Sequence, residues 1–137
     1  MASILKVDDL RGNTSAGDIT VTGEGTATMR LSQGLCKSWV SLNGTSTAVI
    51  DDSFNMSSMT DNGTGNYTVT HTNDLDSASY SAFAGGDINN SNDDVRRNNR
   101  LFRRTASIMK IVCGYNSNSN TKEDWTDVLA GSFGDLA

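Results

Sequence analysis

The chain has 137 residues, a formal net charge of −5 and a sequence pI of about 4.6. It is long enough for one domain, or for one small domain with an arm, and its acidic charge argues against general nucleic-acid binding. No apolar run approaches the ~20 residues of a membrane helix, and the N-terminus lacks the layout of a signal peptide. We therefore expect a soluble product, made in a cytoplasm, with no membrane insertion.

Residues 1–33 are predicted to form an extended N-terminal arm. Two short strands are expected at residues 18–22 and 26–31, joined by a Gly-Glu-Gly turn. An isolated hairpin of this size is only marginally stable in water, so the arm must pack on its own domain, wrap neighbouring copies or dock into a larger body. The apolar residues that we consider candidates for anchoring it are Ile4, Leu5 and Val7.

Residues 34–137 show the regular spacing of short strands that is typical of an antiparallel sandwich. The fold predicted for the chain is therefore all-β, a compact antiparallel β-sandwich preceded by the extended arm. Strands are predicted over residues 35–42, 46–50, 56–60, 66–72, 79–84, 105–115 and 125–133.

Two predicted turns and two tryptophans define further details of the expected sandwich. Asn43-Gly44 predicts a two-residue type I′ hairpin, in which both central residues need a positive φ. Residues 61–65, Asp-Asn-Gly-Thr-Gly, predict a second turn. Trp39 and Trp125 are expected to anchor the core, although each could instead serve as a platform on which a sugar stacks.

Two polar loops, residues 85–95 and 116–124, are candidate ligand-binding segments. Their carboxylate and amide oxygens could bind Ca²⁺, but neither loop has the EF-hand layout, so we expect no metal and no cofactor. They suit sugar recognition better, and plain solvated loops remain the alternative. The candidate ligand-binding residues are Asp87, Asn89, Asn90, Asn92, Asn116, Asn118 and Asn120.

A cluster of arginines lies between these loops. If the segment is helical, its spacing places all five side chains on one face, with Ser91 as the N-cap. The cluster could contact an anionic partner, such as an acidic glycan or an acidic patch on another protein. It could equally pair with carboxylates of this acidic chain or of an adjacent copy. Its members are Arg96, Arg97, Arg100, Arg103 and Arg104.

Residue types that can carry catalysis are present, but their order in the sequence does not indicate an active site. His71 is the only histidine, and no order of Ser, His and Asp supports a triad. Cys36 and Cys113 lie in apolar strand-like stretches and are expected to be buried free thiols. Adjacent carboxylates such as those of Asp51 and Asp52 point to opposite faces of a strand, unlike the facing pair of a glycosidase. We expect no enzymatic activity.

Residues 34–83 and the last ten residues resemble the C-terminal domain of fibre proteins from tailed bacteriophages, especially those of marine hosts. The match is specific because it is long and ordered. Cys36 departs from the family phrase, where Ala is expected, and Thr70-His71-Thr72 replaces a more apolar strand end. The matching positions are Lys37, Trp39, Asn43, Gly44, Thr45, Asp52, Ser53, Phe54, Asn55, Asp61, Asn62, Gly63, Thr64, Gly65, Tyr67, Thr68 and Val69.

The resemblance implies a structural protein of a phage virion, assembled in the host cytoplasm. It implies a homotrimeric fibre or fibre-like appendage that mediates adsorption, with the tips of the C-terminal domain touching the cell surface and possible recognition of a host glycan. The arm would then attach the protein to other virion proteins, of the tail or of the capsid, or join copies. The alternative is a capsid-decorating, head-fibre or adaptor protein that binds virion proteins and recognises no host, because typical tail fibres carry long shafts and this chain has none.

Overall fold

A computed structural model describes residues 6–12, 19–22, 27–87, 97–115 and 121–137 of the chain. The protein divides into two compact units, residues 1–35 and 36–137. This division falls close to the boundary expected between the arm and the sandwich. The roles assigned to the two parts remain predictions.

The first unit contains a minimal hairpin and a single helical turn. Strands β1 (Thr20–Thr22) and β2 (Thr28–Arg30) pair antiparallel, and α1 (Leu31–Gly34) follows directly. β2 ends at Arg30, one residue before the predicted end, because Leu31 already belongs to the helix. No residue described in this unit is buried, so its local pairing is not accompanied by a core.

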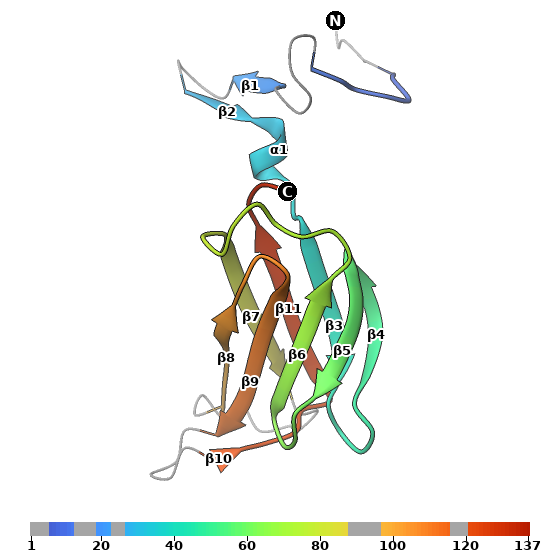
Figure 1. Cartoon of the computed structure of the whole chain (residues 1–137), viewed down its shortest axis with the longest axis vertical. Coiled ribbons are helices and arrows are strands. Elements are labelled where there is room, and N and C mark those ends of the chain that lie inside the picture. The colour runs from blue at the N-terminus through green and yellow to red at the C-terminus, as the bar shows by residue number, and fades with distance from the viewer. Residues whose placement is uncertain (1–5, 13–18, 23–26, 88–96, 116–120) are drawn as a thin grey trace, which may run out of the picture. The chain divides into compact units, whose positions relative to one another are not determined.

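The second unit is a sandwich of two antiparallel sheets (Figure 1). This confirms the predicted all-β fold. The first sheet has the order β4-β3-β11-β7, and in the second sheet β5, β6 and β9 are neighbours while β8 and β10 both pair with β9. The strand bounds are β3 (Ser38–Asn43), β4 (Val49–Phe54), β5 (Met56–Asp61), β6 (Asn66–His71), β7 (Ser81–Asp87), β8 (Arg97–Arg104), β9 (Ile108–Tyr115), β10 (Thr121–Lys122) and β11 (Asp127–Phe133).

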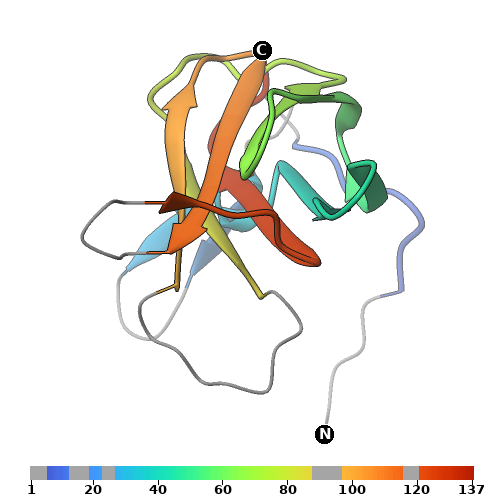
Figure 2. The ribbon, with the colours of Figure 1, turned by 90° about the horizontal axis from the view of Figure 1, so that it is seen from below.

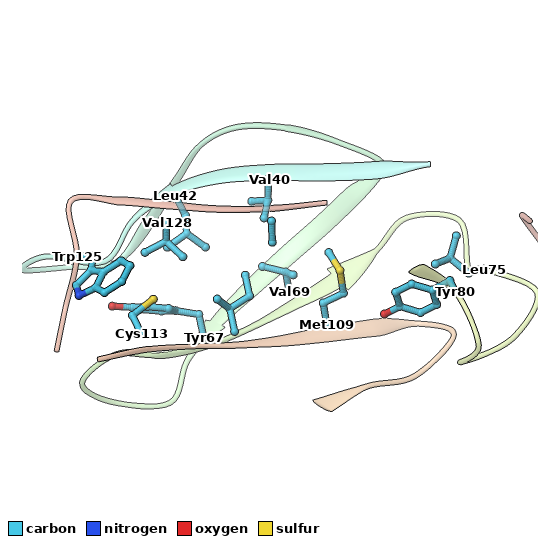
Figure 3. Close-up of a cluster of buried hydrophobic side chains, with 12 residues drawn as sticks. Val40, Leu42, Tyr67, Val69, Leu75, Tyr80, Met109, Cys113, Trp125 and Val128 are labelled. Atoms are coloured by element: carbon cyan, nitrogen blue, oxygen red, sulfur yellow. The ribbon is translucent and has the colours of Figure 1, made fainter. Parts of the chain in front are cut away.

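The core lies between the two sheets. Side chains alternate along the central strands, so that every second residue of β3, β6 and β9 is buried. The buried side chains extend from Trp125 and Tyr67 at one end of the sandwich to Tyr80 and Leu75 at the other (Figure 3). This continuous apolar layer supplies the main favourable free energy of folding for the unit.

The chain passes from one sheet to the other at Asn55. This residue has a φ of 57° and lies between β4, in the first sheet, and β5, in the second. Its side-chain amide donates hydrogen bonds to the carbonyl oxygens of Lys37 and Asn73, both at 3.0 Å, and its Oδ1 accepts one from the backbone N–H of Asn73. Asparagine tolerates this left-handed conformation, which explains the Asp-Ser-Phe-Asn ending of the strand.

The predicted type I′ hairpin at Asn43-Gly44 is wrong. Gly44 is not among the residues with positive φ, and the chain does not enter β4 until Val49. The Oδ1 atom of Asn43 accepts hydrogen bonds from the backbone N–H and the hydroxyl of Thr45, which starts a wider loop with Ser46 at a φ of 61°. The second predicted turn is supported, because Gly63 and Gly65 both have positive φ.

The two tryptophans have different environments. Trp125 lies in the core with 2 % of its surface exposed, as expected. Trp39 is only half-buried, because it occupies the outward parity of β3 between the buried residues Ser38 and Val40. The expectation that Trp39 anchors the core is therefore wrong.

Candidate functional site

The predicted contact loops leave the sandwich at one end. The strand pairing places Asp87 opposite Asp127, and Arg97 opposite Tyr115, which also pairs with Thr121. These strand ends flank residues 88–96 and 116–120, and the connections after β3 and β5 emerge at the same end. We call this the loop-bearing end (Figure 2 looks onto the molecule from it). The second unit begins and ends at the opposite end, with Cys36 and Ala137.

A partly buried hydrogen-bond network forms the base of the loop-bearing end. The hydroxyl of Tyr67 donates to Asp124 Oδ1 at 2.8 Å, with Gly44 O also within reach at 3.2 Å. Asp124 Oδ1 also accepts the backbone N–H of Gly65 at 2.6 Å. Burial, and then the hydrogen bond and charge of Asp124, raise the pKa of the Tyr67 phenol far above its ordinary value. The network therefore ties strand β6 to the segment before β11.

Two glycines are required at this base. A Cβ on Gly44 would overlap the Tyr67 hydroxyl, and one on Gly65, which has a φ of 59°, would lie 2.5 Å from the carbonyl oxygen of Cys113. The backbone N–H of Gly44 donates to the carbonyl of Trp125 at 2.8 Å. Close packing against Tyr67 therefore requires glycine at position 44. From the sequence, a positive φ was expected to be the reason for glycine at this position.

The predicted ligand-binding residues are placed only in part. Asp87 is the last residue of β7, exposed, and its carbonyl oxygen accepts a hydrogen bond from the Thr126 hydroxyl at 3.3 Å. It therefore ends a strand, whereas the sequence predicted a loop from residue 85. The other six candidates lie outside the described residues: Asn89, Asn90, Asn92, Asn116, Asn118 and Asn120.

The arginine segment is a strand. Residues 97–104 form β8, so the helical face predicted for the cluster does not exist. Arg100 pairs in register with Val112 and is exposed on the outer face of the second sheet. Arg104 lies at the opposite end of β8, donates to the carbonyl of Ala78 at 3.2 Å and stands over the Tyr80 ring.

The remaining arginines and the predicted anchors are less defined. Arg97 and Arg103 are placed by register alone, opposite Tyr115 and Lys110, and Arg96 lies outside the described residues. In the first unit, Arg11 forms an ion pair with Asp9. Of the predicted anchors, Ile4 and Leu5 lie outside the described residues, and Val7 is 53 % exposed.

The single histidine has a structural environment that the sequence did not reveal. His71, in β6, lies 3.2 Å from Ser38 Oγ, and Ser38 Oγ lies 2.6 Å from Ser132 Oγ. The other ring nitrogen contacts the carbonyl of Ala106 at 3.0 Å, so that its N–H donates and the Ser38 hydroxyl serves as the donor to Nε2. All three side chains are buried. This chain of hydrogen bonds joins the two sheets and offers no opening to a substrate.

The two cysteines differ in environment. Both thiols are free, with Cys113 buried and Cys36 partly buried. Burial, followed by the charge of Asp124, raises the pKa of Cys113 to about 12, which keeps the thiol protonated at neutral pH. Cys36 Sγ lies 3.1 Å from the carbonyl oxygen of Ser38 and 3.4 Å from that of Ser132.

A second surface was missed by the sequence reasoning. Large apolar side chains cover the outer face of the first sheet, where strand pairing aligns Phe83, Gly131, Trp39 and Phe54 in one row across all four strands. We call this surface the aromatic face and define it by Trp39, Phe54, Phe83, Leu129 and Phe133. Leu129 and Phe133, four positions apart at the outward parity of β11, were the signal for it.

The described residues contain no cluster of His, Cys, Asp and Glu suited to holding a metal ion, and no helix among them is long and apolar enough to span a bilayer. Comparisons with protein-family models, with curated proteins and with solved structures found no match. The surfaces described above and the resemblance in the sequence are therefore the observations that bear on function.

Proposed function

We propose that this chain is a structural protein of a tailed-phage virion, a fibre or fibre-like appendage that mediates adsorption to the host cell. The contact is made at the loop-bearing end of the sandwich. The sequence resemblance supplies the class of protein, and the homotrimer belongs to the same proposal.

The observation that carries the proposal is that the strand ends flanking the two polar loops lie at the same end of the sandwich. The strand ends that flank residues 88–96 and 116–120 lie together, at the end opposite Cys36. Binding residues are commonly placed on loops that a rigid scaffold positions. Here the scaffold includes the partly buried network of Tyr67, Asp124 and Gly65.

The experiment tests adsorption with the purified full-length chain carrying a fluorescent tag. It should bind cells of a susceptible strain and should compete with phage for attachment. A variant in which residues 88–96 and 116–120 are shortened to Gly-Ser turns should lose both properties. Thermal unfolding of this variant shows whether its sandwich is intact.

The matched control changes the opposite end of the sandwich. Ser77 and Ala78 are exposed there, and replacing them with Gly and Ser should leave cell binding unchanged. Cell binding by the loop-shortened variant at the wild-type level would refute the placement of the contact. Failure of the wild type to bind cells would refute adsorption itself.

A second candidate function is a capsid-decorating or adaptor protein that binds other virion proteins. The exposed aromatic face favours it, because contiguous apolar surface usually marks a protein contact. A decoration protein should bind particles that lack it and should not bind cells. The same tagged chain, mixed with capsids purified without it, separates the two functions.

A further inference from the structure

We infer that the aromatic face is an interface between copies of this chain, and that it docks on the outer face of the second sheet of the next copy. The inference goes beyond the proposed function, because it holds for an adsorption fibre and for a decoration protein alike. It names both surfaces of a head-to-tail contact.

The first argument is the exposure of the aromatic face. Phe54 is 53 % exposed, Phe83 50 %, Leu129 44 % and Phe133 37 %. Isolated apolar residues on a surface are normal, but these lie on adjoining strands of one sheet and several share one row. Burying them against a partner would remove apolar surface from water, which favours association.

The rings are also held in a defined arrangement. The Phe83 side chain lies over Gly131, where a Cβ would be 2.5 Å from its ring, and its ring centroid is 6.0 Å from that of Phe133. A glycine at this position lets the aromatic ring lie close to the backbone of β11. The face is therefore organised before any partner arrives, which lowers the entropic cost of binding.

The second argument is charge, which decides between possible partners. The exposed charged side chains that flank the aromatic face on the first sheet are acidic: Asp52 lies opposite Ser41, and Asp87 lies opposite Asp127. An isologous contact, in which two copies join through the same face, would bring these carboxylates together. Like charges across an interface are unfavourable, so the face disfavours its own equivalent.

The outer face of the second sheet has the opposite character. Lys110 and Arg100 project from its outward positions, and Lys122 pairs in register with the outward residue Gly114. The half-buried side chains of Thr68, beside Lys110, and of Val112, beside Arg100, adjoin them and offer methyl groups. We call this surface the basic face and define it by Arg100, Lys110 and Lys122.

The two faces lie on opposite sides of one sandwich, so an acidic apolar surface and a basic surface face away from each other. A contact between unlike faces is heterologous, and repeating it generates a closed ring when the rotation between copies permits closure. We therefore expect a small closed oligomer in which each copy uses both faces. Electrostatic complementarity sets the register of the contact, and the aromatic rings supply most of its free energy.

The experiment uses the full chain, with Trp39 as a local reporter because it belongs to the aromatic face. Its emission should shift to shorter wavelength as concentration rises and the face becomes covered, whereas Trp125 is already buried. Sedimentation velocity measured on the same samples gives the size of the oligomer. The Trp39 readout remains informative even if residues 1–35 also hold copies together.

One variant disables each face. Phe54→Ser with Phe83→Ser removes apolar surface from the aromatic face, and Arg100→Glu with Lys110→Glu reverses the basic face. Each should weaken self-association at least about tenfold and abolish the concentration-dependent shift of Trp39. The control Lys6→Glu with Arg11→Glu makes the same change in net charge in the first unit and should leave the Trp39 shift intact. Thermal unfolding verifies that each variant is folded.

Mixing the two defective variants gives the decisive result. Each retains the face that the other has lost, so the mixture should form dimers joined by one intact contact while each variant alone stays monomeric. The inference is overturned if the wild type is monomeric, or if neither variant changes association. It is also overturned if only the aromatic-face variant dissociates, or if the mixture forms no dimer, since the face would then have a different occupant.

Discussion

The two units of the chain show what strand pairing achieves with and without a core. Unit 36–137 pairs its strands around a continuous layer of buried side chains, whereas unit 1–35 pairs β1 with β2 and buries no described residue. Apolar side chains are present in both. In the first unit they remain exposed, including Val21 at 41 % and Met29 at 53 %.

Apolar residues therefore stabilise a fold only where the topology places them together on one side of a sheet, so that a second layer can cover them. β1 and β2 are three residues each, too short to support a second layer, and an isolated hairpin is marginal in water. The first unit must therefore gain its stability from something other than its own packing. Substitutions in the two units test this contrast between a unit with a buried core and a unit without one.

The largest effect should come from truncating the core at the loop-bearing end. Trp125→Ala should lower the free energy of unfolding of the sandwich by about 3–5 kcal/mol, because a buried indole is replaced by a cavity. Met29→Ala in the first unit should change it by less than about 0.5 kcal/mol. Chemical denaturation followed by circular dichroism measures both, and equal losses would remove the contrast between the units.

The next effect concerns the close contact between Gly44 and Tyr67. Gly44→Ala should cost about 2–3 kcal/mol, since the added methyl group would displace the Tyr67 ring and its bond to Asp124. In a Tyr67→Phe background the same substitution should cost less, because the hydroxyl no longer blocks the methyl group. A double-mutant cycle measures this coupling. Additive effects would place the cost in contacts other than the hydroxyl, namely the ring carbon Cζ of residue 67 at 2.6 Å and the carbonyl oxygen of Trp125 at 3.1 Å.

These residues also show how far the sequence determines the structure. Period-two alternation was sufficient to predict the sandwich and the approximate strands, because it depends only on neighbouring residues. The bonds from Thr45 to Asn43 are local and start a wider loop. The turn at Asn43-Gly44 was mispredicted, since Gly44 packs against Tyr67 and Trp125, which are far away in sequence. For the same reason Trp39 was placed in the core. Only the pairing of β3 with β4 and β11 shows that its parity is outward.

The candidate site was less predictable than the fold. The polarity of the two loops suggested contact residues, but that they leave the sandwich at the same end follows only from the order of the strands. The arginine spacing placed all five side chains on one face only if the segment were helical, and pairing with β9 shows that residues 97–104 form a strand. The aromatic face is assembled from four aligned strands, so the outward residues of β11 alone indicated only two of its five members.

Alkaline pH should destabilise the sandwich through buried phenol and thiol groups. Burial raises the pKa of Tyr80 and of Cys113 to about 12 each, from ordinary values of 10 and 9. A group with a raised pKa contributes fully below its unfolded-state pKa, and its contribution is lost as pH rises through the folded-state value. Stability should therefore fall between about pH 9 and pH 12, measured as a decreasing Tm. Tyr80→Phe should make the decline shallower, and an unchanged slope would contradict this assignment.

The smallest effect on the sandwich should follow removal of the first unit. A chain beginning at Cys36 keeps the whole buried core and the bond from the Lys37 N–H to the Ser132 carbonyl, so its Tm should lie within about 2 °C of the full-length value. The aromatic and basic faces both remain in this chain, which should therefore still self-associate. What it should lose is incorporation into virions, if the arm is the anchor. Collapse of the Tm would show that the first unit completes the fold, and full incorporation would move the anchor into the sandwich.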